Sequence, residues 1–411
     1  QIATIKYLAN YQDDYAEELL FKAFSSPYLQ VRMEASVALA LKKSEKSIGI
    51  IESLMYKLPP YAHIYFPGIF AAIGTKNALS ILKKMFAHSH QEVRLSAISS
   101  AAKYHYDEFL APIRSGATHS ECSDQEVCAC ALGVFKDYES INQLKILANS
   151  QSINVMLAAS NALIQLGHEE YTEKIKNCAL DKQPLAIPLL SEFRNSEHLL
   201  AGMLSNSNYI IKLNAALSLL KMRSSYSLPV IKDILVGKNK SIGYIPAFSQ
   251  GRSLMIWKTV SNKEQLSKKY HIDIPAITHS FKEQLLISSL ELCENDFISL
   301  AKDIFLNKEY ELIPLTTELL ENLNTTQSMA LLEEQSSRIG EPLIRAYSNL
   351  ALYRINGEER YKNNIYKWIK NKNNHDLFKF RDLLPFNDGV TKDNASLLTP
   401  DETSKIMIDS L

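Results

Sequence analysis

One short pattern recurs along this chain and constrains its fold more than any other feature. In the stretch 89–102, SHQEVRLSAISSAA, Ser89 and Glu92 are spaced as a capping box, which predicts that a helix begins here. Val93, Ala97 and Ala101 follow at four-residue steps and therefore share one apolar face of that helix. We expect this face to pack against other helices of the same chain.

The same spacing occurs five times in the first half of the chain, each time with alanine four positions after an apolar anchor. The anchors are Val31, Val93, Val127, Val155 and Ile211, and the alanines are Ala35, Ala97, Ala131, Ala159 and Ala215. A small residue at this position lets neighbouring helices approach closely, where a larger one would wedge them apart. The anchors are 62, 34, 28 and 56 residues apart, which suggests a unit of about 30 residues. A unit of this length suits a pair of helices.

The remaining helical patterns complete these pairs. Amphipathic stretches precede the anchored helices at 17–24, 78–86, 141–148 and 197–204, and two units without an anchor lie at 48–73 and 171–193. After Arg223 the period falters: a helix at 228–236 is followed by irregular stretches at 237–251 and 262–279 around a short helix at 252–260. Helical patterns resume at 281–293, 297–305, 313–323 and 328–337, and Ile344-Arg345 restores the first pattern within 341–355. We predict regular helix pairs over 1–223, irregular pairs over 224–383, and a linker with a short C-terminal helix over 384–411.

A capped second helix that reads Val-Arg-x-x-Ala, in a unit of about 30 residues, resembles HEAT repeats, and most closely the short bacterial kind. The resemblance covers about residues 15–223 and implies a right-handed α-solenoid of stacked antiparallel helix pairs, a HEAT-like or armadillo-type superhelix. Arg32, Arg94, Lys212 and Arg345 match the basic position of the family. Cys128 and Met156 depart from it, and the acidic turn residue of the family is matched only by Asp124.

Composition narrows the classes of partner and compartment. The chain has 45 basic and 45 acidic residues, so it has no net charge to attract nucleic acid or an anionic membrane. No apolar stretch approaches the roughly 20 residues that span a bilayer. Five cysteines without framework spacing indicate reduced thiols and a cytoplasmic protein. Because the chain begins with Gln1 rather than Met, we also expect that an upstream segment, such as a signal peptide, could have been removed.

Three groups of residues invite a chemical interpretation, and none supports one. His119, Cys122, Cys128 and Cys130 suggest a metal, but Cys128 and Cys130 point about 200° apart on a helix. The loop 237–243 resembles a phosphate loop but lacks its Gly-Lys-Ser/Thr ending. The stretch 361–372 mixes lysines with aromatic residues, which suits nucleic acid as well as a solvated terminal helix. We therefore predict no enzyme, no metal and no cofactor.

The leading hypothesis is a non-enzymatic scaffold or adaptor that binds protein along the second helices of the array. Large aromatic residues begin one of these helices, and basic residues form a column across several. The candidate partner-binding residues are Tyr61, His63, Tyr65, Arg32, Arg94, Lys212 and Arg345. Aromatic and arginine side chains are enriched among interface hot spots, although the basic column equally suits hydrogen bonds between units. Two alternatives stay open: a nucleic-acid-binding solenoid, and a lyase similar to the bilin lyases that share this repeat type.

Overall fold

The computed structural model describes residues 13–119, 121–237 and 274–370, the two strands 244–247 and 259–262, and a few positions before residue 13. These residues are almost entirely helical, as the sequence predicts, and many of the helices pack against their neighbours. Contacts divide the chain into two compact units, one of residues 1–218 and 246–261 and the other of residues 219–245 and 262–411.

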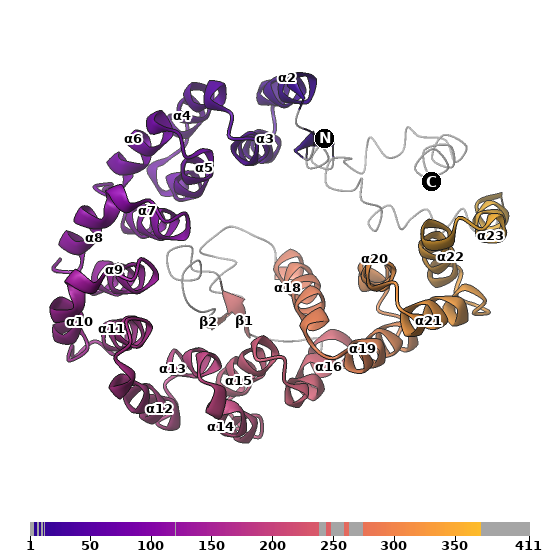
Figure 1. Cartoon of the computed structure of the whole chain (residues 1–411). Coiled ribbons are helices and arrows are strands. Elements are labelled where there is room, and N and C mark those ends of the chain that lie inside the picture. Colours follow the sequence, from indigo (N-terminus) through magenta and orange to yellow (C-terminus); the bar gives the residue numbers. More distant parts are fainter. Residues whose placement is uncertain are drawn as a thin grey trace. The chain divides into compact units, whose positions relative to one another are not determined.

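The helices of the first unit lie in two layers (Figure 1). One layer contains α2 (Asp14–Lys22), α4 (Ile48–Tyr56), α6 (Lys76–Met85), α8 (Leu110–Gly116), α10 (Ile141–Leu147), α12 (Thr172–Leu180) and α14 (Glu197–Met203). The other contains α3 (Leu29–Leu41), α5 (Phe66–Ile73), α7 (Gln91–Lys103), α9 (Cys122–Val134), α11 (Ile153–Gln165), α13 (Ala186–Leu189) and α15 (Tyr209–Lys221), whose last turn belongs to the second unit. The chain thus alternates between the layers, and we call the second set the second-layer helices.

The second-layer helices recur at a fixed interval. The starts of α7, α9 and α11 at Gln91, Cys122 and Ile153 are equally spaced, and α3 begins two such intervals before α7. A residue with a positive, left-handed φ follows each of the helices α3, α5, α7, α9 and α11. These residues recur at the same interval and are Lys43, Gly74, His105, Lys136 and Gly167. A positive φ stops a helix and turns the chain, and it costs a non-glycine residue about 1–2 kcal/mol. At the three non-glycine positions the next amide N–H donates to a carbonyl oxygen inside the helix, from Ser44 to Leu39, from Tyr106 to Ala101 and from Asp137 to Leu132, so backbone hydrogen bonds close the helix there.

This interval corrects one register that the sequence suggests. Val127 is the sixth residue of α9, whereas Val31, Val93 and Val155 are the third residues of their helices. The residue of α9 equivalent to these valines is Asp124, and the small residue four positions later is Cys128 rather than Ala131. Both Cys128 and Ala131 are fully buried, so α9 offers apolar residues in both registers and the sequence pattern matched the wrong one.

The predicted capping box at Ser89 is also wrong. Helix α7 begins at Gln91 with His90 as its N-cap, and no side chain caps its first turn. The carbonyl oxygen of Ser89 instead lies 3.4 Å from Nη1 of Arg94. A side chain one turn into the helix therefore reaches back to the turn that precedes it.

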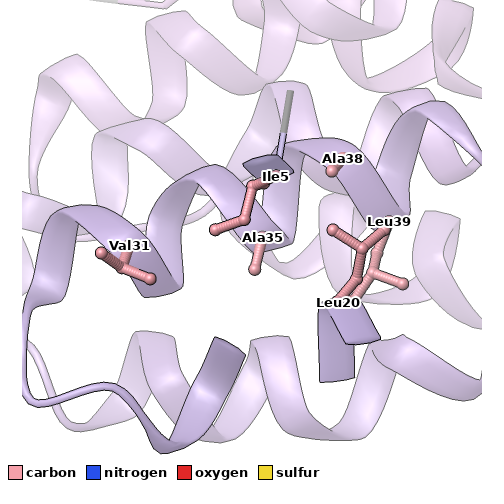
Figure 2. Close-up of a cluster of buried hydrophobic side chains, with 6 residues drawn as sticks. All are labelled: Ile5, Leu20, Val31, Ala35, Ala38 and Leu39. Carbon is pink, nitrogen blue, oxygen red and sulfur yellow. The ribbon is translucent and has the colours of Figure 1, made fainter. Parts of the chain in front are cut away.

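The core of the first unit lies between its two layers. Figure 2 shows the first part of this core, where Val31, Ala35 and Leu39 of α3 are buried together with Leu20 of α2 and Ile5. Val31 is the anchor, Ala35 is the small residue, and Leu39 follows Ala35 by four positions as Ala101 follows Ala97. The prediction that they share one buried face is confirmed.

Helices α9 and α11 approach each other most tightly at a glycine. A Cβ atom placed on Gly133 would lie 2.8 Å from the Cα atom of Ala162 and 2.9 Å from its Cβ atom. Real Cβ atoms essentially never approach other atoms this closely, so only glycine fits here. The small residues that permit close packing therefore extend beyond the alanine column that the sequence pattern identifies.

The second unit contains longer helices and a less regular order. They are α16 (Leu228–Val236), α18 (Ile274–Ser288), α19 (Glu294–Leu306), α20 (Ile313–Leu323), α21 (Thr326–Ser336), α22 (Pro342–Asn356) and α23 (Glu359–Lys370). Helices α16 and α20 have the bounds that the sequence predicts.

Two short strands, β1 (Tyr244–Ala247) and β2 (Thr259–Asn262), pair with each other, a sheet that the sequence pattern does not indicate. Most of the predicted helix at 252–260 and all of the linker and helix at 384–411 lie outside the described residues.

Candidate partner-binding surface

Helix α3 carries an apolar stripe on the side opposite its core. Leu29, Met33, Val37 and Leu41 are spaced four residues apart, so they line one face of the helix over its whole length. Leu29 precedes the core residue Val31 by two positions, which is about 200° of rotation around the helix. The exposed fractions of Leu29, Val37 and Leu41 are 40%, 43% and 63%. Apolar side chains in an exposed row of this kind mark interaction surfaces more often than single exposed ones do.

The middle of this row is buried in the equivalent helices, although Ile153 of α11, which occupies the position of Leu29, is 41% exposed. The positions equivalent to Met33 in α7 and α11 are Leu95 and Leu157, and both are buried. The position equivalent to Val37 in α7 is Ser99, which is also buried. We call Leu29, Met33, Val37 and Leu41 the α3 stripe.

The aromatic turn that precedes α5 contains both exposed and buried residues. Tyr61 and Tyr65 lie in the short helix Pro60–Tyr65 and are 62% and 43% exposed. His63, between them, is only 7% exposed. Tyr61 and Tyr65 can therefore reach a partner, whereas His63 faces the protein and is available only for internal contacts.

The basic column makes contacts within the protein. Nη1 of Arg32 donates to the carbonyl oxygen of Ser26 at 2.7 Å, and Nη1 of Arg94 donates to that of His88 at 3.0 Å. In both cases the acceptor lies in the turn just before the helix that carries the arginine. These hydrogen bonds satisfy backbone carbonyls of the turns, which explains a long donor at the fourth position of the helix.

In α9 the position of Arg32 and Arg94 is occupied by Gln125, which the sequence pattern missed. It is the fourth residue of α9, and its Nε2 atom donates to the carbonyl oxygen of His119 at 2.6 Å. The mistaken register placed Cys128 in this role. Gln125 follows Arg94 by the same interval that separates the starts of their two helices, and this interval is the signal that identifies the correct residue.

Arg94 also joins two neighbouring second-layer helices. Its Nη2 and Nε atoms lie 3.0 and 3.3 Å from the two carboxylate oxygens of Asp124 on α9. The carboxylate of Asp124 is almost fully buried, and Nδ1 of His119 lies 3.7 Å from it. A two-point pair of this kind fixes the angle between the partners as well as their distance. Asp124 is the third residue of α9, so the expectation that it is an acidic turn residue is wrong, although its carboxylate does pair with Arg94.

The two remaining basic candidates lie far along the chain. Lys212 is the fourth residue of α15 and is half-buried. Arg345 is the fourth residue of α22 and is also half-buried, with its Nε atom buried and without a hydrogen bond. Both occupy the helix position of Arg32 and Arg94, as the sequence pattern predicts. Their contribution to binding stays a prediction.

The cysteines near α9 do not converge. Cys122 is exposed at the first residue of the helix, whereas Cys128 and Cys130 are buried in its interior. Burial, together with the nearby charge of Asp124, raises the pKa of the Cys128 thiol far above its usual range, so it stays protonated. Among the residues that the structure describes, no group of three or more potential ligands is placed to hold a metal ion.

A shallow cavity of about 250 Å³ lies between α12, α14 and α15. Its lining is largely apolar and includes Leu180, Leu199, Met203 and Ile211. It coincides with an irregularity in the interval, because α15 begins sooner after α11 than two full intervals would place it, and α13 between them is a short helix.

Neither the known family models nor the curated proteins contain a match to this chain. Within the described part of the chain, the helices are too short or too polar to cross a membrane. The contacts, burial and charges of the described residues therefore carry the functional interpretation.

Proposed function

We propose that this protein is a HEAT-like α-solenoid that acts as a scaffold and binds another polypeptide along its second-layer helices. The observation that carries the proposal is the α3 stripe, an apolar row with three exposed residues and the half-buried Met33, on a helix whose other side is packed. Exposed apolar area gains free energy when it is covered, at about 25 cal/mol per Å². A partner that presents apolar side chains at matching spacing would gain from this term.

The regular interval supports the solenoid part of the proposal. Stacked units need contacts only with their neighbours, and equal spacing of α7, α9 and α11 lets each unit repeat the contacts of the one before. Repeat arrays of this kind use the surface of one helical layer for extended partners. Tyr61 lies in the segment that follows α3 in this layer and adds an exposed aromatic ring, a side chain enriched at interface hot spots.

The basic column fits this proposal as part of the scaffold. The guanidinium groups of Arg32 and Arg94 are already engaged by carbonyl oxygens and, for Arg94, by Asp124. A nucleic-acid groove needs cations that can reach phosphates, and binding would then weaken steeply with salt. We therefore rank a polypeptide above nucleic acid as partner, and we propose no catalytic role.

Site-specific photocrosslinking tests the proposal. A photoreactive amino acid replaces Val37 or Tyr61 in the full chain, and a third variant carries it at Ile146, a 66% exposed residue on α10 in the opposite layer. We expect the same crosslinked polypeptide from native lysate at Val37 and Tyr61, and none of it at Ile146. Equal crosslinking at all three positions, or crosslinks to nucleic acid alone, would refute a partner surface on the second layer.

A further inference from the structure

Two histidine rings connect the turns of successive helix pairs. His63 lies in the short helix Pro60–Tyr65, and His88 lies in the turn between α6 and α7. Nδ1 of His63 is 3.2 Å from Nε2 of His88, which is hydrogen-bonding distance. The two ring centroids are 5.3 Å apart with an edge-to-face orientation. This contact joins positions far apart in the sequence and is made by side chains alone.

Backbone groups at both ends fix the direction of this contact. The amide N–H of His90 donates to Nδ1 of His88 at 3.1 Å, so Nδ1 must be an acceptor and the ring proton lies on Nε2. At the other end, Nε2 of His63 lies 3.2 Å from the carbonyl oxygen of Leu58, so Nε2 must carry the proton. His63 then offers Nδ1 as the acceptor for the Nε2–H of His88. The amide of His90 can only donate and the carbonyl of Leu58 can only accept. All three hydrogen bonds therefore form only when both rings are neutral.

A second proton on either ring breaks one link. On His88 it would occupy Nδ1 and face the amide N–H of His90. On His63 it would occupy Nδ1 and face the Nε2–H of His88. If His88 moved its own proton to Nδ1 to accept from a protonated His63, the conflict with the His90 amide would return. Every protonated form therefore places two donors against each other.

The surroundings of His88 favour its neutral ring. His63 is buried, and the ring of Tyr56 on α4 packs edge-on against it with centroids 6.3 Å apart. His88 faces the ring of His90 and the guanidinium of Arg94, which is itself paired with Asp124 of α9. Burial, followed by the charges of His63 and His90, lowers the pKa of His88 below its usual value. Protonation of His88 would add a positive charge near the guanidinium of Arg94.

We propose that His63 and His88 form a pH-sensitive latch between two successive helix pairs, closed when both rings are neutral and opened by protonation of either ring. The latch holds the turn after α4 to the turn before α7. Leu58 precedes Pro59 and Pro60, which have no N–H to offer its carbonyl, so the His63 ring supplies that donor. Opening would release this turn while the apolar core between the layers stays packed.

Hydrogen exchange of the full chain between pH 7.5 and 5.5 tests the latch. Exchange is read in peptides that cover residues 58–66 and 86–94 and is corrected for the intrinsic pH dependence. Protection there should fall on acidification, by at most about tenfold per pH unit for one proton. His88→Gln should abolish the pH response, because its amide does not titrate and can turn either a donor or an acceptor toward His63. His168→Gln, which removes a histidine paired with Glu170 away from the latch, should keep the wild-type response.

Two outcomes would overturn the latch. One is protection of both peptides that does not change between pH 7.5 and 5.5 in the wild type, and the other is an equal loss in His88→Gln. If that variant does not fold, nitrogen-15 NMR of the wild-type histidines decides instead. The latch requires the proton on Nε2 of both His63 and His88 at pH 7.5, and a proton on Nδ1 of either ring at that pH would contradict it.

Discussion

Arg94 of α7 contacts both carboxylate oxygens of Asp124 on α9, with nitrogen–oxygen distances of 3.0 and 3.3 Å. The same arginine donates to the carbonyl oxygen of His88, one of the two residues of the histidine latch. One side chain thus links its own turn to the following helix pair. Its contribution to stability should therefore exceed that of an ion pair on the surface.

Arg94→Met should lower the free energy of unfolding by about 2 kcal/mol, because it leaves the buried Asp124 carboxylate without its main partner. Arg223→Met is the matched control, since Arg223 pairs with Glu291 where both side chains are largely exposed. Such a pair contributes about 0–1 kcal/mol. Denaturant unfolding of both variants measures the difference, and equal losses would contradict a special role for Arg94.

The contact between α9 and α11 should not tolerate a single added methyl group. Gly133→Ala places a Cβ atom against Ala162 and should cost about 1–3 kcal/mol. Gly202→Ala on α14 meets no atom within 4 Å and should stabilise the protein by up to about 1 kcal/mol. Thermal unfolding should therefore shift in opposite directions for the two substitutions. A stabilised Gly133→Ala protein would show that the helices can separate without loss.

Replacing a positive-φ residue after a second-layer helix by glycine should stabilise the protein. Lys136→Gly removes the strain of a φ of 53° and should raise stability by about 1 kcal/mol. Lys103→Gly, inside the last turn of α7, should instead lower stability by up to about 1 kcal/mol. Chemical denaturation of the two variants compares the same replacement in opposite backbone conformations. A loss of stability in both would show that the Lys136 side chain matters more than its backbone.

The Asp137 carboxylate should contribute to stability only above its own titration. Hydrogen bonds from Arg114 hold the pKa of Asp137 below its usual value, against the opposing effect of burial. A carboxyl whose folded pKa lies below the unfolded value of about 3.9 stabilises the protein above that pH and loses this effect as the pH falls through the folded value. Asp137→Asn should therefore be destabilised at pH 7 and approach the wild type below pH 4.

The control for this titration is Asp107→Asn, an exposed carboxyl in the turn before α8. It should leave the unfolding free energy close to that of the wild type at both pH values. A difference between Asp137→Asn and the wild type that stays constant down to pH 3 would show that the Asp137 carboxylate does not act through its charge.

Much of the helical layout could be predicted from the sequence, because apolar periodicity is a local signal. The bounds of α16 and α20 were predicted to the residue, and the core face Val31, Ala35 and Leu39 was identified correctly. The register of α9 was predicted wrongly, because this helix is apolar on several sides. Val127 matches the apolar spacing of the pattern, whereas Asp124 matches the interval between the helix starts.

The candidate surface was only partly visible in the sequence. Tyr61 and Tyr65 were identified as aromatic residues in a turn, and they are exposed, while His63 between them is buried. The α3 stripe was missed because Leu29, Val37 and Leu41 have the same residue types as core positions. The histidine latch depends on the distance between two turns from successive helix pairs, which packing sets and periodicity does not reveal.

The affinity of the crosslinked partner for two matched variants tests the central claim most directly. Val37→Glu places a charge in the α3 stripe, and Ile146→Glu places one on α10 in the opposite layer, at residues whose exposure limits any effect on folding. We predict that Val37→Glu weakens partner binding by about tenfold or more, which is about 1.4 kcal/mol, while Ile146→Glu binds as the wild type does and both keep its melting temperature. Wild-type affinity in Val37→Glu, or equal losses in both variants, would contradict a partner surface on the second-layer helices.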